Sequence, residues 1–336
     1  MIQTGADIYM QTLQPPTLED IERARDNIRG LAIRTPLVRL NVADAPAEIF
    51  LKLENLQPTG AFKVRCQGNV VKSATSEELE PGVFTGSSGN SGTALAWVTR
   101  HFGIPARVYA PQDAPQNKLE AIKELGARVH VLPYEDWWNV LMQGRYPGEN
   151  GFFANAVNSQ AALAGNATIG LEILEDLPDV DTVVVPFGGG GVSCGIASAI
   201  RALKPDVRVL AAESEAALPL AAALEAGGPV PVRHSNSFIS GLGAESVLPV
   251  MWPLISELLD GAVSSTLDEV AAAIRLLFES NRVVTEGAGA VAPAAALSGK
   301  AGPGKIVCVV SGGNIDTHHF IDVLSGRRPG PPLPKD

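Results

Sequence analysis

The chain of 336 residues is 46% hydrophobic and only 18% charged, a composition typical of a compact α/β enzyme with room for two domains. Its 26 basic and 36 acidic residues give a net charge of -10, which disfavours a nucleic acid or an anionic membrane as a partner. Cys66, Cys194 and Cys308 are odd in number and far apart, so we predict reduced core thiols rather than a disulfide framework or a metal site.

The two ends of the sequence carry no candidate site. Residues 1–14 lack the basic start and apolar core of a secretory signal, and no apolar run of about eighteen residues occurs, so we expect a cytoplasmic protein. Residues 327–336 hold four prolines among glycine and charged residues, and are predicted to form a flexible tail.

Between the ends, strand and helix patterns alternate. Thr17 and Asp20 predict the N-terminus of a first helix, which ends at Gly30. Apolar, β-rich runs follow at residues 49–53, 106–110, 128–132, 182–186, 207–212 and 305–310, and helix-length segments such as 92–102 and 114–125 separate most of them. This alternation predicts an α/β fold of open parallel sheets with helices on both faces.

Lys63 is the first candidate for a catalytic residue. An apolar run broken by Pro58 and Gly60 precedes it, so it is expected just past a strand, at the opening of a helix. A desolvated lysine amine is a usable nucleophile and can form a Schiff base with an aldehyde. The alternative is a surface lysine whose stem covers apolar area, and the position alone favours that alternative.

Four consecutive glycines follow the strand predicted at residues 182–186 and precede a helix. They are Gly188, Gly189, Gly190 and Gly191. Their backbone N–H groups can form a concave nest, and the helix N-terminus adds a positive dipole end, so the segment suits a phosphate dianion. A tight turn is the alternative, but four glycines cost much backbone entropy for a turn alone, so we favour the phosphate site.

A second strand-to-helix junction is rich in hydroxyl and amide groups. It carries Ser87, Ser88, Gly89, Asn90 and Ser91. Such groups at a helix start suit an anion, for example a carboxylate. Capping of the helix by serine or asparagine is the alternative.

Six segments, taken in order, resemble the fold type II family of pyridoxal-phosphate enzymes, and specifically its serine/threonine dehydratase branch. They are residues 34–37 (RTPL), 61–65 (AFKVR), 87–92 (SSGNSG), 164–172 (AGNATIGLE), 188–191 (GGGG) and 311–314 (SGGN). The resemblance implies a large cofactor-binding domain of residues 1–49 and 151–326, with residues 50–150 as a small inserted domain. It also implies a cofactor, pyridoxal 5'-phosphate, in the cleft between them, a small amino-acid substrate and a homodimer.

The resemblance assigns roles to the candidate residues. Lys63, next to Phe62 at the cofactor, would hold pyridoxal phosphate covalently and serve as general base. Asn90 would hydrogen-bond the pyridine 3-oxygen, and the four glycines would bind the phosphate. The substrate carboxylate would be received by Ser87, Ser88, Gly89 and Ser91, and in related serine racemases the residue at Ser88 protonates the α-carbon.

Three further positions are interpreted from the same resemblance. Ser311 would face the pyridine nitrogen, and Glu286 would lie near the ring, with a helix N-terminal glutamate as the alternative. Glu213 matches an acidic ligand in family members that bind a divalent cation, and a monovalent cation held by carbonyl groups is the alternative. The histidines, including His318 and His319, lack convincing metal-ligand spacing and are interpreted as structural or surface residues.

The prediction is a pyridoxal-phosphate-dependent ammonia-lyase that dehydrates a β-hydroxy-α-amino acid to a 2-oxo acid and ammonia. Ala61, Cys66 and Ser91 depart from the family pattern, so threonine, serine and 3-phenylserine all stand as substrates. Arg65 could bind a second substrate carboxylate or form a salt bridge at the helix start. A β-replacement enzyme of the cysteine synthase kind, an amino-acid racemase and a catalytically silent regulatory subunit remain alternatives.

Overall fold

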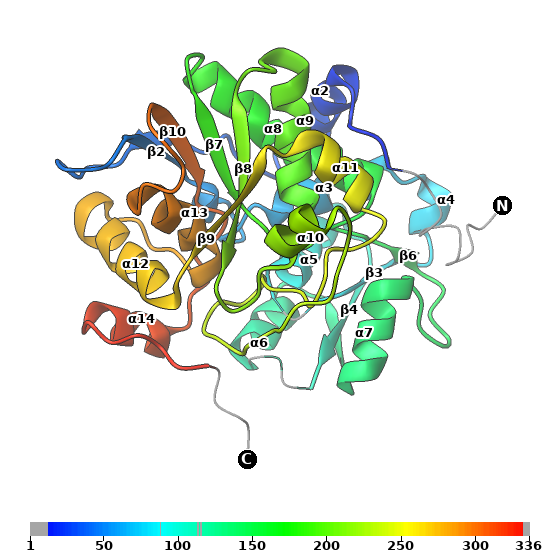
Figure 1. Ribbon diagram of the computed structural model, residues 1–336. Helices are drawn as coiled ribbons and strands as arrows, with labels where there is room; N and C mark the ends of the chain where they lie inside the picture. Colours follow the sequence, from blue (N-terminus) through cyan, green and yellow to red (C-terminus); the bar gives the residue numbers. More distant parts are fainter. Residues whose placement is uncertain (1–12, 88, 113, 115, 332–336) are drawn as a thin grey trace.

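The computed structural model describes residues 13–87, 89–112, 114 and 116–331, and its strands form two sheets (Figure 1). The larger sheet has the order β1 (Leu37–Arg39), β2 (Glu48–Lys52), β10 (Lys305–Val309), β7 (Thr182–Pro186), β8 (Arg208–Ser214) and β9 (Gly261–Ser265). The smaller sheet has the order β5 (Arg128–Leu132), β4 (Ala106–Pro111), β3 (Val83–Gly86) and β6 (Phe152–Phe153). All strand pairs are parallel except β1 with β2. The predicted fold class is confirmed, and the antiparallel edge follows from the short β1–β2 connection, which cannot make a parallel crossover.

Helices surround both sheets. They are α2 (Leu18–Asn27), α3 (Lys63–Ser73), α4 (Ser76–Leu79), α5 (Asn90–Phe102), α6 (Gln116–Glu124), α7 (Tyr134–Gln143), α8 (Gln160–Asp176), α9 (Gly191–Leu203), α10 (Pro219–Ala226), α11 (Trp252–Leu258), α12 (Leu267–Asn281), α13 (Gly287–Leu297) and α14 (Thr317–Leu324), with a 3-10 turn, η1, at Glu54–Leu56. The predicted first helix is confirmed, because Thr17 and Asp20 form a reciprocal capping box at the start of α2. In the part of the chain that the structure describes, no helix is long and apolar enough to cross a membrane.

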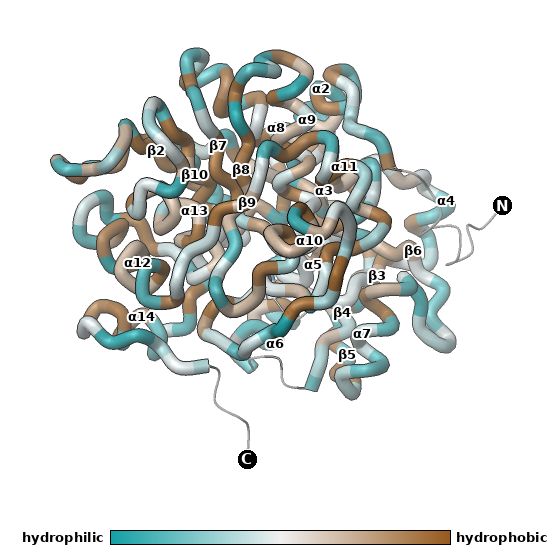
Figure 2. The backbone as a smooth tube through the Cα atoms, viewed as in Figure 1, coloured by the Kyte–Doolittle hydropathy of each residue, from teal (hydrophilic) through white to brown (hydrophobic). Residues whose placement is uncertain are grey.

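The apolar core runs through the central strands of the larger sheet (Figure 2). All five residues of β7 are buried, as expected for a parallel strand covered on both faces. Cys66, Cys194 and Cys308 are buried free thiols, as predicted. Of the predicted tail, residues 327–331 form no helix or strand, and the remainder lies outside the described residues.

The two sheets do not divide where the domain boundaries were predicted. The boundary at residue 50 falls inside β2, which pairs with β1 and β10 in the larger sheet. The boundary at residue 150 precedes β6, which pairs with β3 in the smaller sheet. Strand pairing, which the sequence does not display, decides both positions.

Each sheet reverses its strand order at one point, and the candidate loops leave the sheets there. In the larger sheet the chain proceeds outward from β7 to β8 and β9, and then returns to place β10 on the other side of β7. The glycines at 188–191 follow β7, and Ser311 follows β10. In the smaller sheet β3 is the corresponding strand, and it leads into Asn90. Open α/β sheets bind ligands at such switch points, beyond the carboxyl ends of their strands.

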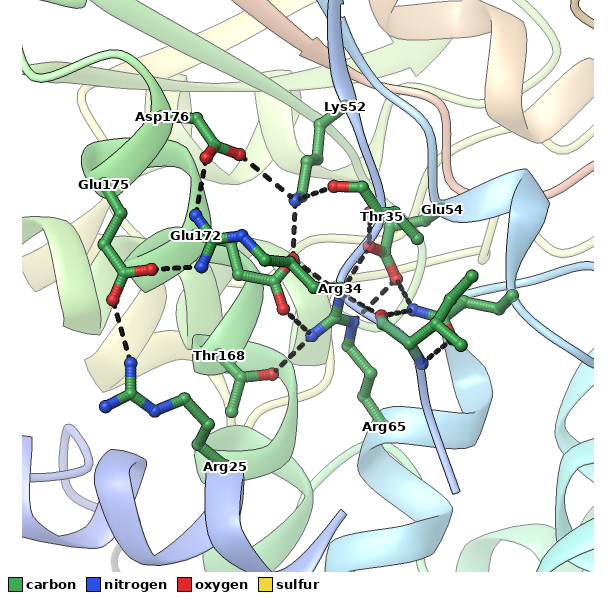
Figure 3. Close-up of polar contacts among 12 residues, drawn as sticks. Arg25, Arg34, Thr35, Lys52, Glu54, Arg65, Thr168, Glu172, Glu175 and Asp176 are labelled. Carbon is green, nitrogen blue, oxygen red and sulfur yellow. Dashed lines mark hydrogen bonds and ion pairs between the residues drawn. The ribbon is translucent and has the colours of Figure 1, made fainter. Parts of the chain in front are cut away.

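A buried cluster of charged side chains fixes the start of α3 (Figure 3). The guanidinium of Arg65 donates to both oxygens of Glu54, at 2.8 Å each, and to both oxygens of Glu172, at 2.7 and 2.8 Å. Lys52 Nζ lies 2.5 Å from Glu172 Oε2 and 2.6 Å from the Thr35 carbonyl. We call Lys52, Glu54, Arg65 and Glu172 the buried ion cluster.

The side chains of the buried ion cluster are almost inaccessible to solvent, and their charges sum to zero. The exposed fraction is 1% for the Arg65 side chain and 0% for those of Lys52 and Glu54. Burial alone would lower the pKa of Arg65, but Glu54 and Glu172 outweigh it and hold the pKa above its ordinary value. Because the guanidinium is occupied by two carboxylates, the salt-bridge interpretation of Arg65 is correct and the substrate-carboxylate interpretation is wrong.

Removing the central cation should destabilise the fold strongly. We expect Arg65→Met to lower the free energy of unfolding by about 3–5 kcal/mol, because it leaves Glu54 without a cation and Glu172 with Lys52 alone. Urea unfolding measures the change. The control is Arg29→Ala, which removes a cation whose side chain is 81% exposed in its pair with Asp26, and should leave the midpoint unchanged. Equal midpoints for both variants would contradict a structural role for the cluster.

Candidate active site

Lys63 is the first residue of α3, and its surroundings come from two distant segments. The Phe62 N–H donates to the Ser311 carbonyl (3.0 Å) and the Gly313 N–H donates to the Gly60 carbonyl (2.8 Å). The amine of Lys63 lies 4.9 Å from the centroid of the Phe62 ring. It makes no hydrogen bond or ion pair with any residue that the structure describes. The half-buried amine is therefore free to react.

Asn90 is held from both ends of its side-chain amide. Its Nδ2 donates to Glu286 Oε1 at 2.6 Å, and its Oδ1 accepts from Asn314 Nδ2 at 2.9 Å. Asn314 Nδ2 also donates to the Thr59 carbonyl, four residues before Lys63. These contacts join the loops that follow β3 and β10 to the start of α13, so Asn90, Glu286 and the Lys63 segment belong to one site.

Glu286 stands at the N-cap position of α13 but makes no capping hydrogen bond. Its side chain instead contacts Asn90, so helix capping does not explain this residue. Burial raises the pKa of Glu286 to about 7, while the charge of Lys118 and the hydrogen bond from Asn90 act in the opposite direction and Asp316 raises it further. A carboxyl group in this environment changes protonation near neutral pH.

The serines of the α5 loop make contacts within the protein. Ser87 Oγ accepts hydrogen bonds from the N–H groups of Gly89 (3.2 Å) and Gly92 (3.0 Å), which is the capping interpretation. Ser91 Oγ accepts from Gln67 Nε2 on α3 at 2.9 Å. Ser88 lies outside the described residues.

The glycine loop has donors without protein partners. None of the N–H groups of residues 188–191 donates to a described residue, and no side chain caps α9. A Cβ atom on Gly188 would lie 2.8 Å from the Gly241 carbonyl oxygen, and one on Gly191 would lie 2.6 Å from the Val157 carbonyl oxygen. Gly190 adopts φ +88°, a left-handed conformation that favours glycine. The loop therefore requires glycine and presents the N–H groups that an anion needs.

Packing of three helices connects this loop to Lys63. A Cβ atom on Gly165 of α8 would lie 2.6 Å from the Arg65 carbonyl oxygen of α3. A Cβ atom on Gly195 of α9 would lie 2.7 Å from the Leu163 carbonyl oxygen of α8. The backbones of α3, α8 and α9 thus touch directly, close to the starts of α3 and α9.

The surroundings of Ser311 and Glu213 differ. Ser311 is buried in the loop after β10, with its carbonyl bonded to Phe62. Glu213, at the end of β8, accepts from the N–H groups of Leu220 (2.7 Å) and Ala221 (3.0 Å) at the start of α10. Burial raises the pKa of Glu213, and these two bonds act against that rise. The carboxylate therefore caps α10, and its contacts give no support to a cation there.

Two residues of the site were not assigned from the sequence. Asn314 orients Asn90, and Gln67 holds Ser91. Asn314 follows a strand through a glycine pair, as Asn90 follows one through a glycine, and that shared pattern was the available signal. A cleft of about 200 Å³ opens beside Asn314 and is lined by Thr59, Gly89, Asn90, Thr93, Lys118, Ala121, Asn314 and Ile315.

The sequence pattern of a family described as "Pyridoxal-phosphate dependent enzyme" matches residues 28–312. The chain belongs to this pyridoxal-phosphate-dependent enzyme family. It is 36% identical over 325 residues to the L-threonine ammonia-lyase of Thermotoga maritima, covering 93% of this chain and 80% of the relative. It is 36% identical over 316 residues to the catabolic L-threonine dehydratase of Escherichia coli K12, covering 90% of this chain and 94% of the relative.

Solved structures give the same result. Maize serine racemase superposes with a TM-score of 0.85 at 31% identity, over 93% of this chain and 98% of that one. The T.th. threonine deaminase superposes with a TM-score of 0.83 at 29% identity, over 90% and 99% of the two chains. The comparisons confirm the predicted family, the cofactor pyridoxal phosphate and the enzyme class, an ammonia-lyase. They also confirm β-elimination of a β-hydroxy-α-amino acid as the reaction, but they give no support to 3-phenylserine as the substrate.

The residues present fit this cofactor. The unpartnered N–H groups at 188–191 suit its phosphate, and the free amine of Lys63 suits its aldehyde. Asn158 Nδ2 is a further buried donor with no hydrogen bond to a described residue, and it directly follows Val157, which packs against Gly189 and Gly191. These N–H and amine groups can therefore bind an anionic ligand that carries a carbonyl group.

The raised pKa of Glu286 predicts a defined pH dependence of stability. An ordinary glutamate pKa near 4.5 in the unfolded chain and one of about 7 in the folded enzyme mean that the unfolded state loses its proton first as the pH rises. The contribution of Glu286 to stability is therefore full below about pH 4.5, declines up to about pH 7 and is constant above. Glu286→Gln should remove this decline, which urea unfolding at a series of pH values would detect.

The control for this measurement is Glu257→Gln, which changes an exposed carboxyl group on α11. It should follow the wild-type profile in parallel. If Glu286→Gln also ran parallel to wild type between pH 5 and 7, Glu286 would not be buried as a neutral acid.

Proposed function

We propose that the enzyme dehydrates and deaminates L-threonine, and L-serine as a second substrate, to a 2-oxo acid and ammonia. The observation that carries this proposal is the free, half-buried amine of Lys63 beside an Asn90 side chain fixed by Glu286 and Asn314. The names of the relatives from Thermotoga maritima and Escherichia coli support threonine.

Each group has a part in this reaction. When bound, pyridoxal phosphate supplies an electron-withdrawing ring conjugated to the substrate α-carbon. The Lys63 amine anchors the cofactor and then takes the α-proton as general base. Asn90 would orient the ring, the N–H groups at 188–191 would hold the phosphate, and Ser311 would offer a neutral hydroxyl to the pyridine nitrogen.

The start of α5 would receive the substrate carboxylate. Ser91 accepts a hydrogen bond from Gln67, and its hydroxyl keeps a proton that it can donate to an anion. The Ser87 hydroxyl donates to the Gly89 carbonyl at 3.4 Å and would exchange this long bond for one to the carboxylate. Gly89 lines the cleft at the N-terminus of α5, where the helix dipole favours an anion. Ser88 completes the group assigned to the carboxylate.

Amino-acid racemisation is a second candidate activity, because the structure resembles maize serine racemase at 31% identity. Such an activity requires an acid on the second face of the α-carbon, the role that the resemblance to serine racemases implies for Ser88. Chiral chromatography of L-serine incubated with the enzyme would reveal D-serine.

The small inserted domain, the homodimer and the cytoplasmic location also stay predictions.

Replacement of the catalytic amine should abolish the activity. We expect Lys63→Ala to lose the borohydride-trappable adduct and to lower the rate of 2-oxo acid release by about 10³-fold or more. Lys72→Ala changes the last turn of the same helix and should keep both. Wild-type turnover by Lys63→Ala would contradict the mechanism, and wild-type protein without a trappable adduct would favour a silent regulatory subunit.

Competition between substrates tests the specificity. With L-threonine and 3-phenylserine at equal concentration in one vessel, we expect threonine to be consumed on the order of a hundredfold faster, since a pocket fitted to a methyl group excludes a ring. Product analysis distinguishes 2-oxobutanoate from phenylpyruvate. Preferential loss of 3-phenylserine would contradict the threonine proposal, and cysteine formed from sulfide and an activated serine would favour β-replacement.

A further inference from the structure

Three side chains with metal-binding atoms converge at the start of α14. They are Asp316, His318 and His319, and their ligand atoms all lie within 4.8 Å of one another. Neither the cofactor nor the proposed reaction uses these side chains. Figure 1 shows α14 at the edge of the molecule beside α12. The two helices pack through the rings of Phe278 and Phe320, whose centroids lie 5.3 Å apart.

Helix geometry explains why the three side chains meet. Asp316 is the N-cap of α14, and His318 and His319 are its second and third residues. The N-cap residue and the third residue lie on the same face of a helix, three positions apart. The two imidazole rings also pack against each other, with centroids 4.1 Å apart.

His319 is a buried polar side chain without a hydrogen bond. It is only 6% exposed, and neither ring nitrogen makes a hydrogen bond with any residue that the structure describes. Its Nδ1 lies 3.9 Å from Asp316 Oδ2, which is too far for a hydrogen bond. The ring nitrogens of His319 are therefore available to bind a ligand.

We propose that Asp316, His318 and His319 form a binding site for a divalent transition metal of the Zn²⁺ class. Two imidazole nitrogens and one carboxylate oxygen are ligands that zinc, nickel and copper accept, whereas Mg²⁺ and Ca²⁺ prefer oxygen alone. Metal–ligand bonds of about 2.0–2.2 Å place ligand atoms about 3.3 Å apart in a tetrahedral site. His318 is exposed, so side-chain rotation can close the remaining distance.

The charges around the site are compatible with this assignment. A histidine that binds a metal must be neutral, and the burial of His319 favours the neutral ring. The carboxylates of Asp316 and Asp322 attract a cation, and the amine of Lys118 opposes it. The site is separate from Glu213, which lies on β8 and caps α10.

The proposed metal site lies beside the active site. Asn314 and Ile315, which line the cleft, immediately precede Asp316. A metal bound to Asp316 and His319 would fix the first turn of α14 two residues from Asn314, the residue that orients Asn90.

The test is titration of the holoenzyme with cobalt(II) chloride as a visible probe, followed by displacement with zinc chloride. Wild-type protein should develop the d–d absorption of one bound Co²⁺ and lose it when Zn²⁺ is added. His318→Ala and Asp316→Asn should each weaken binding about tenfold or more. Asp316→Asn keeps a good N-cap residue, so the helix start survives.

The control is His101→Ala, which removes an exposed histidine on α5 and should bind Co²⁺ like wild type. His319→Gln should abolish binding, and His318→Ala and Asp316→Asn keep the test decisive if that variant fails to fold. Absence of the absorption in wild type, or equal affinity in wild type, His318→Ala and Asp316→Asn, would overturn the proposal. Pyridoxal phosphate can itself bind metals, but such binding would be the same in every variant.

Discussion

The buried ion cluster of Lys52, Glu54, Arg65 and Glu172 is the constraint on which the active site depends. Two cations and two anions are held where water cannot screen them, so loss of any one leaves a charge that the interior does not tolerate. Because the four residues come from β2, η1, α3 and α8, the cluster has one arrangement in which all bonds form. Lys63 stands two residues before Arg65, and its position is therefore set by these bonds.

Direct backbone contact extends this constraint to the phosphate site. Gly165 and Gly195 let α3, α8 and α9 approach so closely that a Cβ atom at either position would lie within 2.7 Å of a carbonyl oxygen of the neighbouring helix. The spacing between Lys63 and the N-terminus of α9 then depends on backbone atoms, which do not change rotamer. The segment 164–172 therefore has a structural role. Gly165 allows the close approach of α8 to α3, and Glu172 binds the guanidinium of Arg65.

Local sequence patterns predicted the positions of helices and strands better than they predicted which distant residues contact one another. The ends of β5 and β7 were predicted to the residue, although only β7 is a buried strand with a continuous apolar run and β5 is a largely exposed edge strand. The strands β1, β6 and β9 were missed, because the first two have only three and two residues and β9 is rich in glycine and serine. The family motifs located Asn90 and Glu286, but their hydrogen bond spans 196 positions, and no local pattern encodes such a pairing. Asn314 was unassigned for the same reason.

The glycine loop shows how a cofactor site and the stability of the fold are coupled. Gly190 and Gly191 are buried, and their N–H groups have no acceptor among the described residues. Leaving a buried N–H without any partner costs about 1–3 kcal/mol, so an acceptor bound at this loop avoids that cost. Close packing against Val157 and Gly241 keeps the loop from relaxing. A ligand that satisfies the donors removes this cost only in the folded state, and binding therefore stabilises the fold as well as orienting the reactive group.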